Sequence, residues 1–177
     1  MDVLVVMDEL SMLVPDKDTT VGFILAAQAL GHTVDFAQVS NLFIENGDGG
    51  VRSRSIEINA TESPFYNLGE FKTKTLSTYD TIWMRKDPPV DRSYLHATHI
   101  LDLVGKNTLV VNSPSAVRFA NEKLYALQFP SLCPDTLVTR SIRQIRERLE
   151  GNKKPLIVKP VDGHGGAGIF LLSPDDR

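Results

Sequence analysis

The pattern of hydrophobic and polar positions over the first 40 residues predicts a strand, then a helix, then a second strand. Val3–Met7 is a compact apolar run, typical of a strand that is buried on both faces. Asp18 offers an N-cap for a helix through about residue 30, and Gly31 follows the last apolar position, as a helix C-terminus prefers. Thr33–Val39 then alternates as a second strand. The pattern predicts a β-α-β unit, which implies two parallel strands and a right-handed crossover.

The middle of the chain predicts a second unit of the same kind. Asn46–Gly50 is a turn signal between two extended stretches. Residues 60–78 are polar and irregular, and we expect a long loop there. Tyr79–Met84 predicts a strand, residues 93–104 a helix, and Thr108–Val111 another strand. Two β-α-β units predict an α/β fold, a small doubly wound, Rossmann-like domain with a parallel sheet.

The pattern changes again after residue 111. Asn112-Ser113-Pro114 resembles the start of a new helix, and we place the boundary so that the domains are residues 1–120 and 121–177. The second part predicts shorter elements around a glycine-rich segment: a helix at 121–129 ended by Pro130, a brief strand at 137–138, an amphipathic helix at 141–149, and strands at 156–159 and 169–172.

Composition narrows the class of protein. Of 177 residues, 42% are hydrophobic and 23% charged, as expected of a soluble globular chain. The net charge of −3 argues against a nucleic-acid partner, and no apolar run approaches the roughly 20 residues of a membrane span. Cys133 is the only cysteine, so no intramolecular disulfide or cysteine metal cluster is expected. These features favour a reducing cytoplasm.

Residues 159–168 carry the most informative chemistry. Four glycines stand within six positions, which leaves a backbone that can approach an anion closely and present its N–H groups to it. Lys159 ends the preceding apolar strand and can add an ammonium group. A Walker loop or a dinucleotide fingerprint would open a helix, whereas here Ile169–Leu172 and a proline turn follow. The segment therefore predicts a hairpin flap over a nucleotide; the alternative is a flexible hairpin without a ligand.

Several segments resemble those of a known family. Ile157–Gly168 resembles the lysine strand and glycine loop of ATP-grasp ligases. Met84–Pro89 and Asn121–Leu124 resemble, more narrowly, the prokaryotic glutathione synthetase family, as do Leu137–Arg140 and Val6–Asp8. The resemblance covers nearly the whole chain in order, and the Met-Arg-Lys-Asp-Pro-Pro segment is what indicates this member of the superfamily.

The resemblance implies a site for ATP at the start of an ATP-grasp nucleotide lobe. It assigns two lysines and a loop to the nucleotide: Lys123, Lys159, Gly163, His164, Gly165, Gly166, Ala167 and Gly168. The implied reaction phosphorylates the C-terminal carboxylate of γ-glutamylcysteine, and the amine of glycine then attacks the acyl phosphate. From the residues alone, the favoured interpretation of Lys123 is a solvated helix lysine, because lysine is mostly found at the surface, and that of His164 is a solvated loop histidine.

Arg85 and Asp87 follow the end of a predicted strand, at the edge where open α/β sheets bind ligands. An arginine can bind a carboxylate with two parallel hydrogen bonds, which suits a peptide substrate. The alternative is a rigid Asp-Pro-Pro turn with Arg85 in a structural salt bridge. Asp18 is a further candidate for the substrate site, although a plain helix cap also explains it.

The resemblance also implies what this stretch of sequence lacks. No catalytic residue and no metal ligand is assigned within the chain. The ligands of Mg²⁺, which prefers oxygen atoms, are expected in a C-terminal part beyond it, so we expect the chain to be a fragment that is inactive alone. The family also implies a homo-oligomer.

Two other functions remain open at this point. One is another ATP-grasp carboxylate–amine ligase, and the other is a non-catalytic nucleotide-binding or assembly module. A Rossmann oxidoreductase is disfavoured, because Asp8–Ser11 follows the first strand where a glycine fingerprint would be needed.

Overall fold

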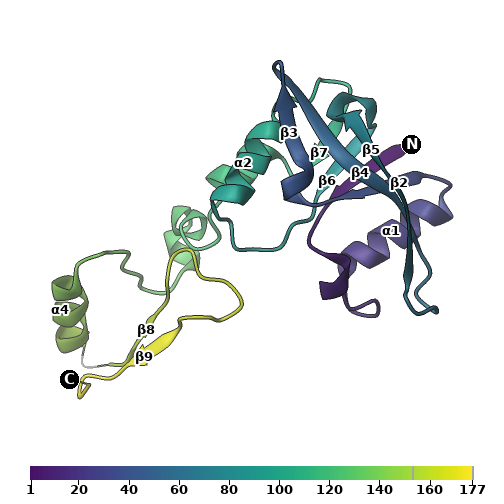
Figure 1. Ribbon diagram of the computed structural model, residues 1–177. Coiled ribbons are helices and arrows are strands. Elements are labelled where there is room, and N and C mark those ends of the chain that lie inside the picture. Colours follow the sequence, from purple (N-terminus) through teal and green to yellow (C-terminus); the bar gives the residue numbers. More distant parts are fainter. Residues whose placement is uncertain (153, 177) are drawn as a thin grey trace. The chain divides into compact units, whose positions relative to one another are not determined.

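The computed structural model describes residues 1–152 and 154–176. The chain forms two compact units, one spanning Met1–Phe119 and the other beginning at Ala120 (Figure 1).

The first unit is built on one seven-stranded sheet with the strand order β3-β4-β2-β1-β6-β7, in which β5 also pairs with β4. Its elements are β1 (Asp2–Val6), α1 (Thr19–Ala29), β2 (Thr33–Ala37), β3 (Leu42–Glu45), β4 (Asp48–Ile58), β5 (Tyr66–Thr75), β6 (Thr81–Met84), α2 (Arg92–Leu101), β7 (Leu109–Val111) and α3 (Pro114–Phe119).

The predicted doubly wound core is confirmed. Strands β2, β1, β6 and β7 are parallel neighbours, and helices α1 and α2 cover opposite faces of them (Figure 1). The central strand β1 explains the apolar run: Leu4 and Val6 pack with α2, whereas Val3 and Val5 pack with α1. Because successive side chains of a strand point to opposite faces, a strand between two helix layers must be apolar at every position.

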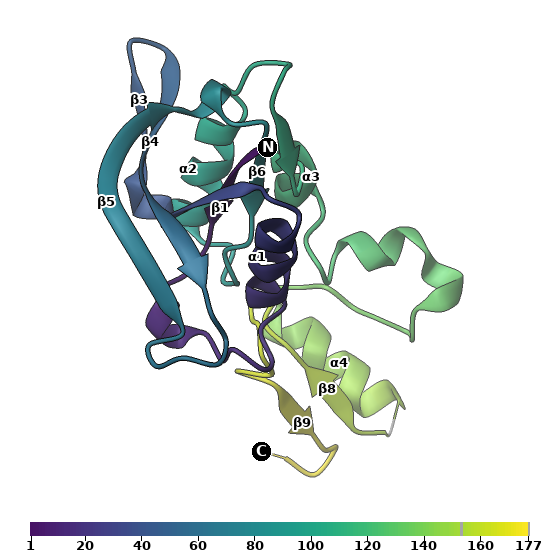
Figure 2. The same cartoon turned by 90° about the vertical axis from the view of Figure 1, so that its right-hand side faces the viewer.

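The sheet is not purely parallel, and the loop expected at residues 60–78 is wrong. β3, β4 and β5 extend the sheet in antiparallel fashion, and β5 pairs with β4 as a long curved ribbon (Figure 2). The ten residues of β5 are mostly exposed or half-buried. An edge strand with exposed positions tolerates polar residues, so its sequence carries little of the apolar signal on which the prediction depended.

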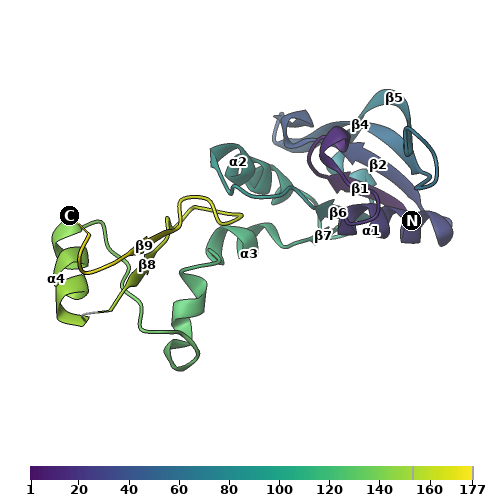
Figure 3. The same cartoon turned by 90° about the horizontal axis from the view of Figure 1, so that it is seen from below.

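The second unit contains α4 (Ile142–Asn152), β8 (Leu156–Val158) and β9 (Phe170–Leu172). The two strands form an antiparallel hairpin (Figure 3), so the predicted strand–loop–strand arrangement is confirmed. Helix α4 runs three residues beyond the predicted end at Leu149 and includes Gly151.

Two predicted elements of the second unit are wrong. The helix expected at 121–129 is a turn followed by a 3₁₀ turn at Tyr125–Gln128, because Pro130 disfavours helical backbone at the residue before it and nine residues are too few for a stable helix alone. No strand forms at Leu137–Val138. Within the described residues, β8 and β9 pair only with each other, so this segment has no partner strand.

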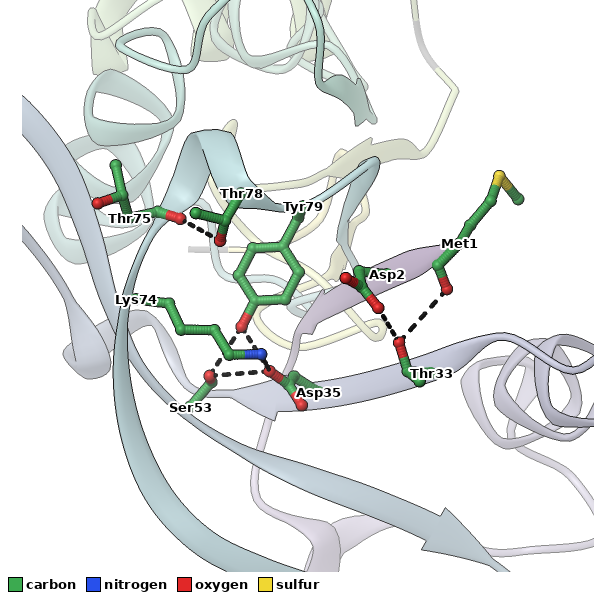
Figure 4. Close-up of polar contacts among 9 residues, drawn as sticks. All are labelled: Met1, Asp2, Thr33, Asp35, Ser53, Lys74, Thr75, Thr78 and Tyr79. Carbon is green, nitrogen blue, oxygen red and sulfur yellow. Dashed lines mark hydrogen bonds and ion pairs between the residues drawn. The ribbon is translucent and has the colours of Figure 1, made fainter.

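A buried polar cluster joins the parallel and antiparallel parts of the first unit (Figure 4). Oδ2 of Asp35, on β2, accepts hydrogen bonds from Tyr79 Oη at 2.6 Å, Lys74 Nζ at 2.7 Å and Ser53 Oγ at 3.2 Å. The Ser53 and Tyr79 hydroxyls also lie 2.8 Å apart. Ser53 is fully buried and Tyr79 nearly so. One carboxylate therefore ties together β2, β4, β5 and the segment before β6.

This cluster shifts the pKa values of two of its members. Burial alone would raise the pKa of Asp35, but hydrogen bonds from Lys74, Tyr79 and Ser53 and the charge of Lys74 outweigh it and lower the pKa below its ordinary value of 3.8. Burial, followed by the bond to Asp35, raises the pKa of Tyr79 above its ordinary value of 10.0. The Asp35 contribution to stability is therefore present above about pH 4 and is lost as the pH falls, whereas that of Tyr79 is lost as the pH rises beyond about 10.

We predict that Tyr79→Phe lowers the free energy of unfolding of the first unit by about 1.5–3 kcal/mol at neutral pH, because it removes a buried hydrogen bond to a carboxylate. The fall in stability between about pH 5 and pH 3 should also become shallower, because Asp35 loses a donor that holds its pKa down. Urea unfolding followed by the fluorescence of Trp83, the single tryptophan, measures both effects.

Tyr66→Phe is the matched control. Tyr66 lies half-buried on β5, and within the described residues its hydroxyl has no hydrogen bond, so the same change should alter stability by less than about 0.5 kcal/mol. Equal effects of the two substitutions would show that the Asp35 cluster does not stabilise the unit.

Candidate functional site

The glycine loop between β8 and β9 has a backbone that requires its glycines. Val158 pairs with Phe170 at the base of the hairpin. Gly165, Gly166 and Gly168 have φ angles of 57°, 80° and 71°, in the left-handed region that side chains with a Cβ rarely adopt. The run of glycines is therefore a requirement of the conformation of this loop.

The loop is also tightly folded on itself. The Ala167 N–H donates to the His164 carbonyl at 3.0 Å, and the Gly163 N–H donates to the Pro160 carbonyl at 3.3 Å. A Cβ at Gly163 would lie 2.5 Å from Pro160 Cγ and 3.2 Å from the Ala167 carbonyl oxygen. A proline ring and a backbone carbonyl cannot move aside easily, so only glycine fits at this position.

The structure brings Lys123 onto this loop. Oδ1 of Asn121 accepts hydrogen bonds from the backbone N–H groups of Lys123 and Leu124, at 3.0 and 3.1 Å, and so forms the turn that carries the lysine. Its ammonium group donates to the carbonyl of Gly163 and, at 3.4 Å, to that of Val161. Lys123 is therefore not the solvated helix lysine that the residues alone also allowed.

Glu122 is a member of this cluster for which the sequence predicted no role. Its Oε1 lies 2.6 Å from Lys123 Nζ, and the hydrogen bond and charge of that lysine lower the pKa of Glu122. Its only sequence signal is its place beside Lys123. Glu122 therefore neutralises part of the charge of Lys123, and the ammonium group of Lys123 holds the loop at the same time.

A cavity of about 170 Å³ collects these groups. It is lined by Glu122, Lys123, Lys159, Pro160, Gly163, His164, Gly165, Gly166, Ala167 and Ile169. Both predicted lysines thus border one space with the glycine loop. They differ in their contacts: within the described residues Lys159 Nζ forms no ion pair or hydrogen bond, whereas Lys123 Nζ is fully engaged. His164 is exposed at the rim.

A second cluster of predicted residues lies in the first unit, where β1 and β6 end side by side. Arg85 follows β6, and its guanidinium donates to the hydroxyls of Thr19 at 2.7 Å and Thr20 at 3.3 Å, at the start of α1. The guanidinium carbon also lies 5.5 Å from the ring centroid of Phe23. No carboxylate pairs with Arg85 within the described residues, so the structural salt bridge considered for it is absent.

The other two candidates for the substrate site have different surroundings. Asp87 is exposed, and its backbone N–H donates to Oδ2 of Asp8 at 2.8 Å. Asp18 caps α1 by accepting a hydrogen bond from the Thr20 N–H at 2.7 Å, as a plain cap requires. Asp8 is a residue for which sequence reasoning gave no role, although its place directly after a buried parallel strand is a signal for a ligand-binding edge.

A wider hollow of about 560 Å³ lies along β3 and β4, lined by Ser40–Glu45, Arg52 and Thr73. It is open to solvent and contains none of the predicted site residues. We therefore place the candidate sites at the glycine loop and at the ends of β1 and β6.

Metal-ligating side chains do not cluster in the described part of the chain. Across residues 1–152 and 154–176, no three His, Cys, Asp or Glu side chains gather closely enough to hold a metal ion. Among the same residues, no helix is long and apolar enough to cross a membrane.

Comparison with known proteins decides the family. Residues 1–118 match the sequence model of the prokaryotic glutathione synthetase N-terminal domain, and residues 122–177 match that of the prokaryotic glutathione synthetase ATP-grasp domain. The chain belongs to the prokaryotic glutathione synthetase family. The two matches meet between residues 118 and 122, next to the junction of the two compact units.

Curated relatives carry the same family name. Over 100% of its length, the chain is 40% identical to the glutathione synthetase of Thermosynechococcus vestitus and 42% identical to that of Gloeobacter violaceus. It is 39% identical, over 97% of its length, to that of Yersinia pestis. It covers 58%, 56% and 54% of those proteins, so it spans little more than half the length of the curated relatives it matches.

We predict that Lys123→Met loosens the glycine loop of the ligand-free chain, because the Gly163 and Val161 carbonyls lose their ammonium partner. Amide hydrogen exchange of residues 162–168 should become faster by about fivefold or more, equivalent to roughly 1 kcal/mol. Lys159→Met is the matched control and should leave the exchange unchanged. Equal exchange in the two variants would contradict a role for Lys123 in holding the loop.

Proposed function

We propose that this chain supplies the dipeptide-binding and phosphate-binding parts of an ATP-dependent ligase that joins γ-glutamylcysteine to glycine to form glutathione. Membership of the prokaryotic glutathione synthetase family supports the reaction. The observation that carries the proposal is the cavity in which Lys123, Lys159 and the glycine loop face one space.

The geometry of this cavity suits the phosphates of ATP. Backbone N–H groups of a loop with successive glycines can turn toward phosphate oxygens, and two ammonium groups can neutralise the charge that phosphoryl transfer moves. Lys159 has no competing partner within the described residues and is available at once. To bind phosphate oxygens, the ammonium group of Lys123 must give up its contacts with the loop carbonyls and Glu122. Nucleotide binding is therefore expected to change the conformation of the loop.

The proposed chemistry proceeds in two steps. A carboxylate oxygen of γ-glutamylcysteine attacks the γ-phosphorus of ATP, the bond to the β-phosphate oxygen breaks, and ADP leaves. The amine of glycine then attacks the carbonyl carbon of the acyl phosphate, loses a proton, and inorganic phosphate leaves with the C–O bonding pair. The residues described here bind and orient these groups.

Arg85 is the proposed ligand for a carboxylate of the dipeptide. It is half-buried, its position is fixed by the two threonine hydroxyls and the Phe23 ring, and no carboxylate of the described chain neutralises it. A guanidinium held in this way and lacking an anionic partner is suited to bind a carboxylate with charge-assisted hydrogen bonds. Asp87 and Asp18 flank it, and we propose that they border the same ligand.

In the full protein that carries this chain, Arg85→Ala should weaken γ-glutamylcysteine binding by about 10- to 100-fold, the effect of losing roughly 1.5–3 kcal/mol of charged hydrogen bonding. Nucleotide binding should change by less than twofold. Isothermal titration with each ligand separates the two effects.

Arg92→Ala is the control for Arg85. Arg92 is exposed at the start of α2 and has no contact that would fix its guanidinium within the described residues. Its loss should leave both affinities unchanged. Equal losses for ATP and the dipeptide in Arg85→Ala, or no loss at all, would contradict the assignment.

The loop provides a second test of the same function. If the glycine loop closes over phosphates, a non-hydrolysable ATP analogue should slow proteolytic cleavage within residues 162–168 of the full protein by at least about tenfold. AMP, which lacks the β- and γ-phosphates, is the control ligand. Identical cleavage with analogue, with AMP and without nucleotide would rule out a phosphate-binding flap.

A further inference from the structure

The segment after β6, which begins with Arg85, is contacted by one carboxylate from the residues that follow β1. β1 and β6 pair in parallel with Val6 opposite Met84, which places Asp8 beside the residues that follow β6. Oδ1 of Asp8 lies 2.7 Å from Lys86 Nζ, and Oδ2 accepts the Asp87 N–H at 2.8 Å. Both oxygens are thus committed to this segment.

This arrangement distinguishes two adjacent cations. Lys86 is paired with Asp8 and also donates to the Asp87 carbonyl at 2.8 Å. Its charge is therefore neutralised, and its ammonium group is occupied by contacts with neighbouring protein atoms. Arg85 is bonded only to neutral groups. Of the two, Arg85 alone presents an uncompensated charge to a ligand.

The pair is sheltered from solvent. The side chains of Asp8 and Lys86 are 18% and 22% exposed, whereas the ion pairs that contribute little are the solvent-exposed ones. Removing one partner of a sheltered pair leaves the other charge without compensation. Lys86 would then be free to compete with Arg85 for the same anion.

We infer that Asp8 is a positioning residue for substrate binding: it fixes the 85–87 segment and neutralises Lys86, so that the dipeptide carboxylate is received by Arg85 alone. The inference rests on the proposed function, because it concerns the same carboxylate site. It goes beyond that function by assigning Asp8 and Lys86 a shared role and by predicting that their effects are coupled.

The experiment compares Asp8→Asn, Lys86→Met and the double variant in the full protein. Asparagine keeps an oxygen for the Asp87 N–H and removes only the charge that Lys86 needs. We expect Asp8→Asn to raise the KM for γ-glutamylcysteine about tenfold, with kcat and the KM for ATP within about twofold of the parent. The double variant should recover most of the loss, since no unpaired ammonium remains.

Asp80→Asn is the matched control. Asp80 also accepts a backbone N–H, that of Asp2 at 2.7 Å, at the opposite end of β1, but it has no cation partner within the described residues. Its substitution should leave the KM for γ-glutamylcysteine unchanged. Thermal unfolding of each variant, followed by Trp83 fluorescence, identifies any loss of folded protein.

The outcomes separate this inference from the function on which it rests. If Arg85→Ala raises the KM for the dipeptide and Asp8→Asn does not, the inference is wrong and the function stands. If Asp8→Asn lowers kcat and raises both KM values alike, or if Lys86→Met fails to restore the double variant, Asp8 acts only on the overall structure and the inference is again overturned. If Arg85→Ala has no effect either, the carboxylate site itself is misplaced.

Discussion

The parallel pairing of β1 with β2 and β6 is the constraint on which the first unit depends. It buries Val3–Val6 between two helix layers, and the apolar area removed from water there is the main source of stability for such a core. The same pairing brings the carboxyl ends of β1 and β6 to one edge. Asp8, Arg85 and the start of α1 meet there because the core requires that alignment of the strands, and the candidate substrate site is a consequence of it.

The antiparallel extension of the sheet needs a different kind of support. β5 is largely exposed, so hydrophobic burial cannot hold it as it holds β1. The Asp35 carboxylate supplies part of this support, because it accepts three hydrogen bonds, from β4, β5 and the segment before β6. A carboxylate that is largely removed from water is stable only when its oxygen atoms accept hydrogen bonds. The Asp35 cluster is therefore stable only while all of its strands keep their positions.

The second unit is organised by backbone conformation more than by a core. Ile157, Phe170 and Leu171 are 63%, 63% and 65% exposed, so the hairpin buries little of its apolar surface within the described residues. Its shape comes from glycines with positive φ, from the close approach of Gly163 to Pro160, and from Lys123 across the loop. A loop held by a few polar contacts can change when a stronger anion competes for the same ammonium group, and this property suits a nucleotide flap.

The sequence by itself determined the elements whose signals are local. The apolar run of β1, the cap and glycine at the two ends of α1, and the glycine-rich hairpin could all be predicted, because burial on both faces, capping and positive φ each demand particular residue types at particular positions. Lys159 and Arg85 could be named as candidates because each follows a predicted strand, whereas Lys123 was a candidate only through the resemblance to ATP-grasp ligases.

Only the tertiary structure decided the rest. β5 could not be predicted, because an exposed edge strand needs no apolar pattern. The wrong helix at 121–129 is a different case, because Pro130 and the shortness of the segment are local features to which the prediction gave too little weight. The partners of Asp35 lie 18 to 44 residues away, and Asp8 and Asp87 are 79 residues apart. No local rule connects such positions, so the contacts that orient Arg85 and Lys86 exist only once the strands have paired.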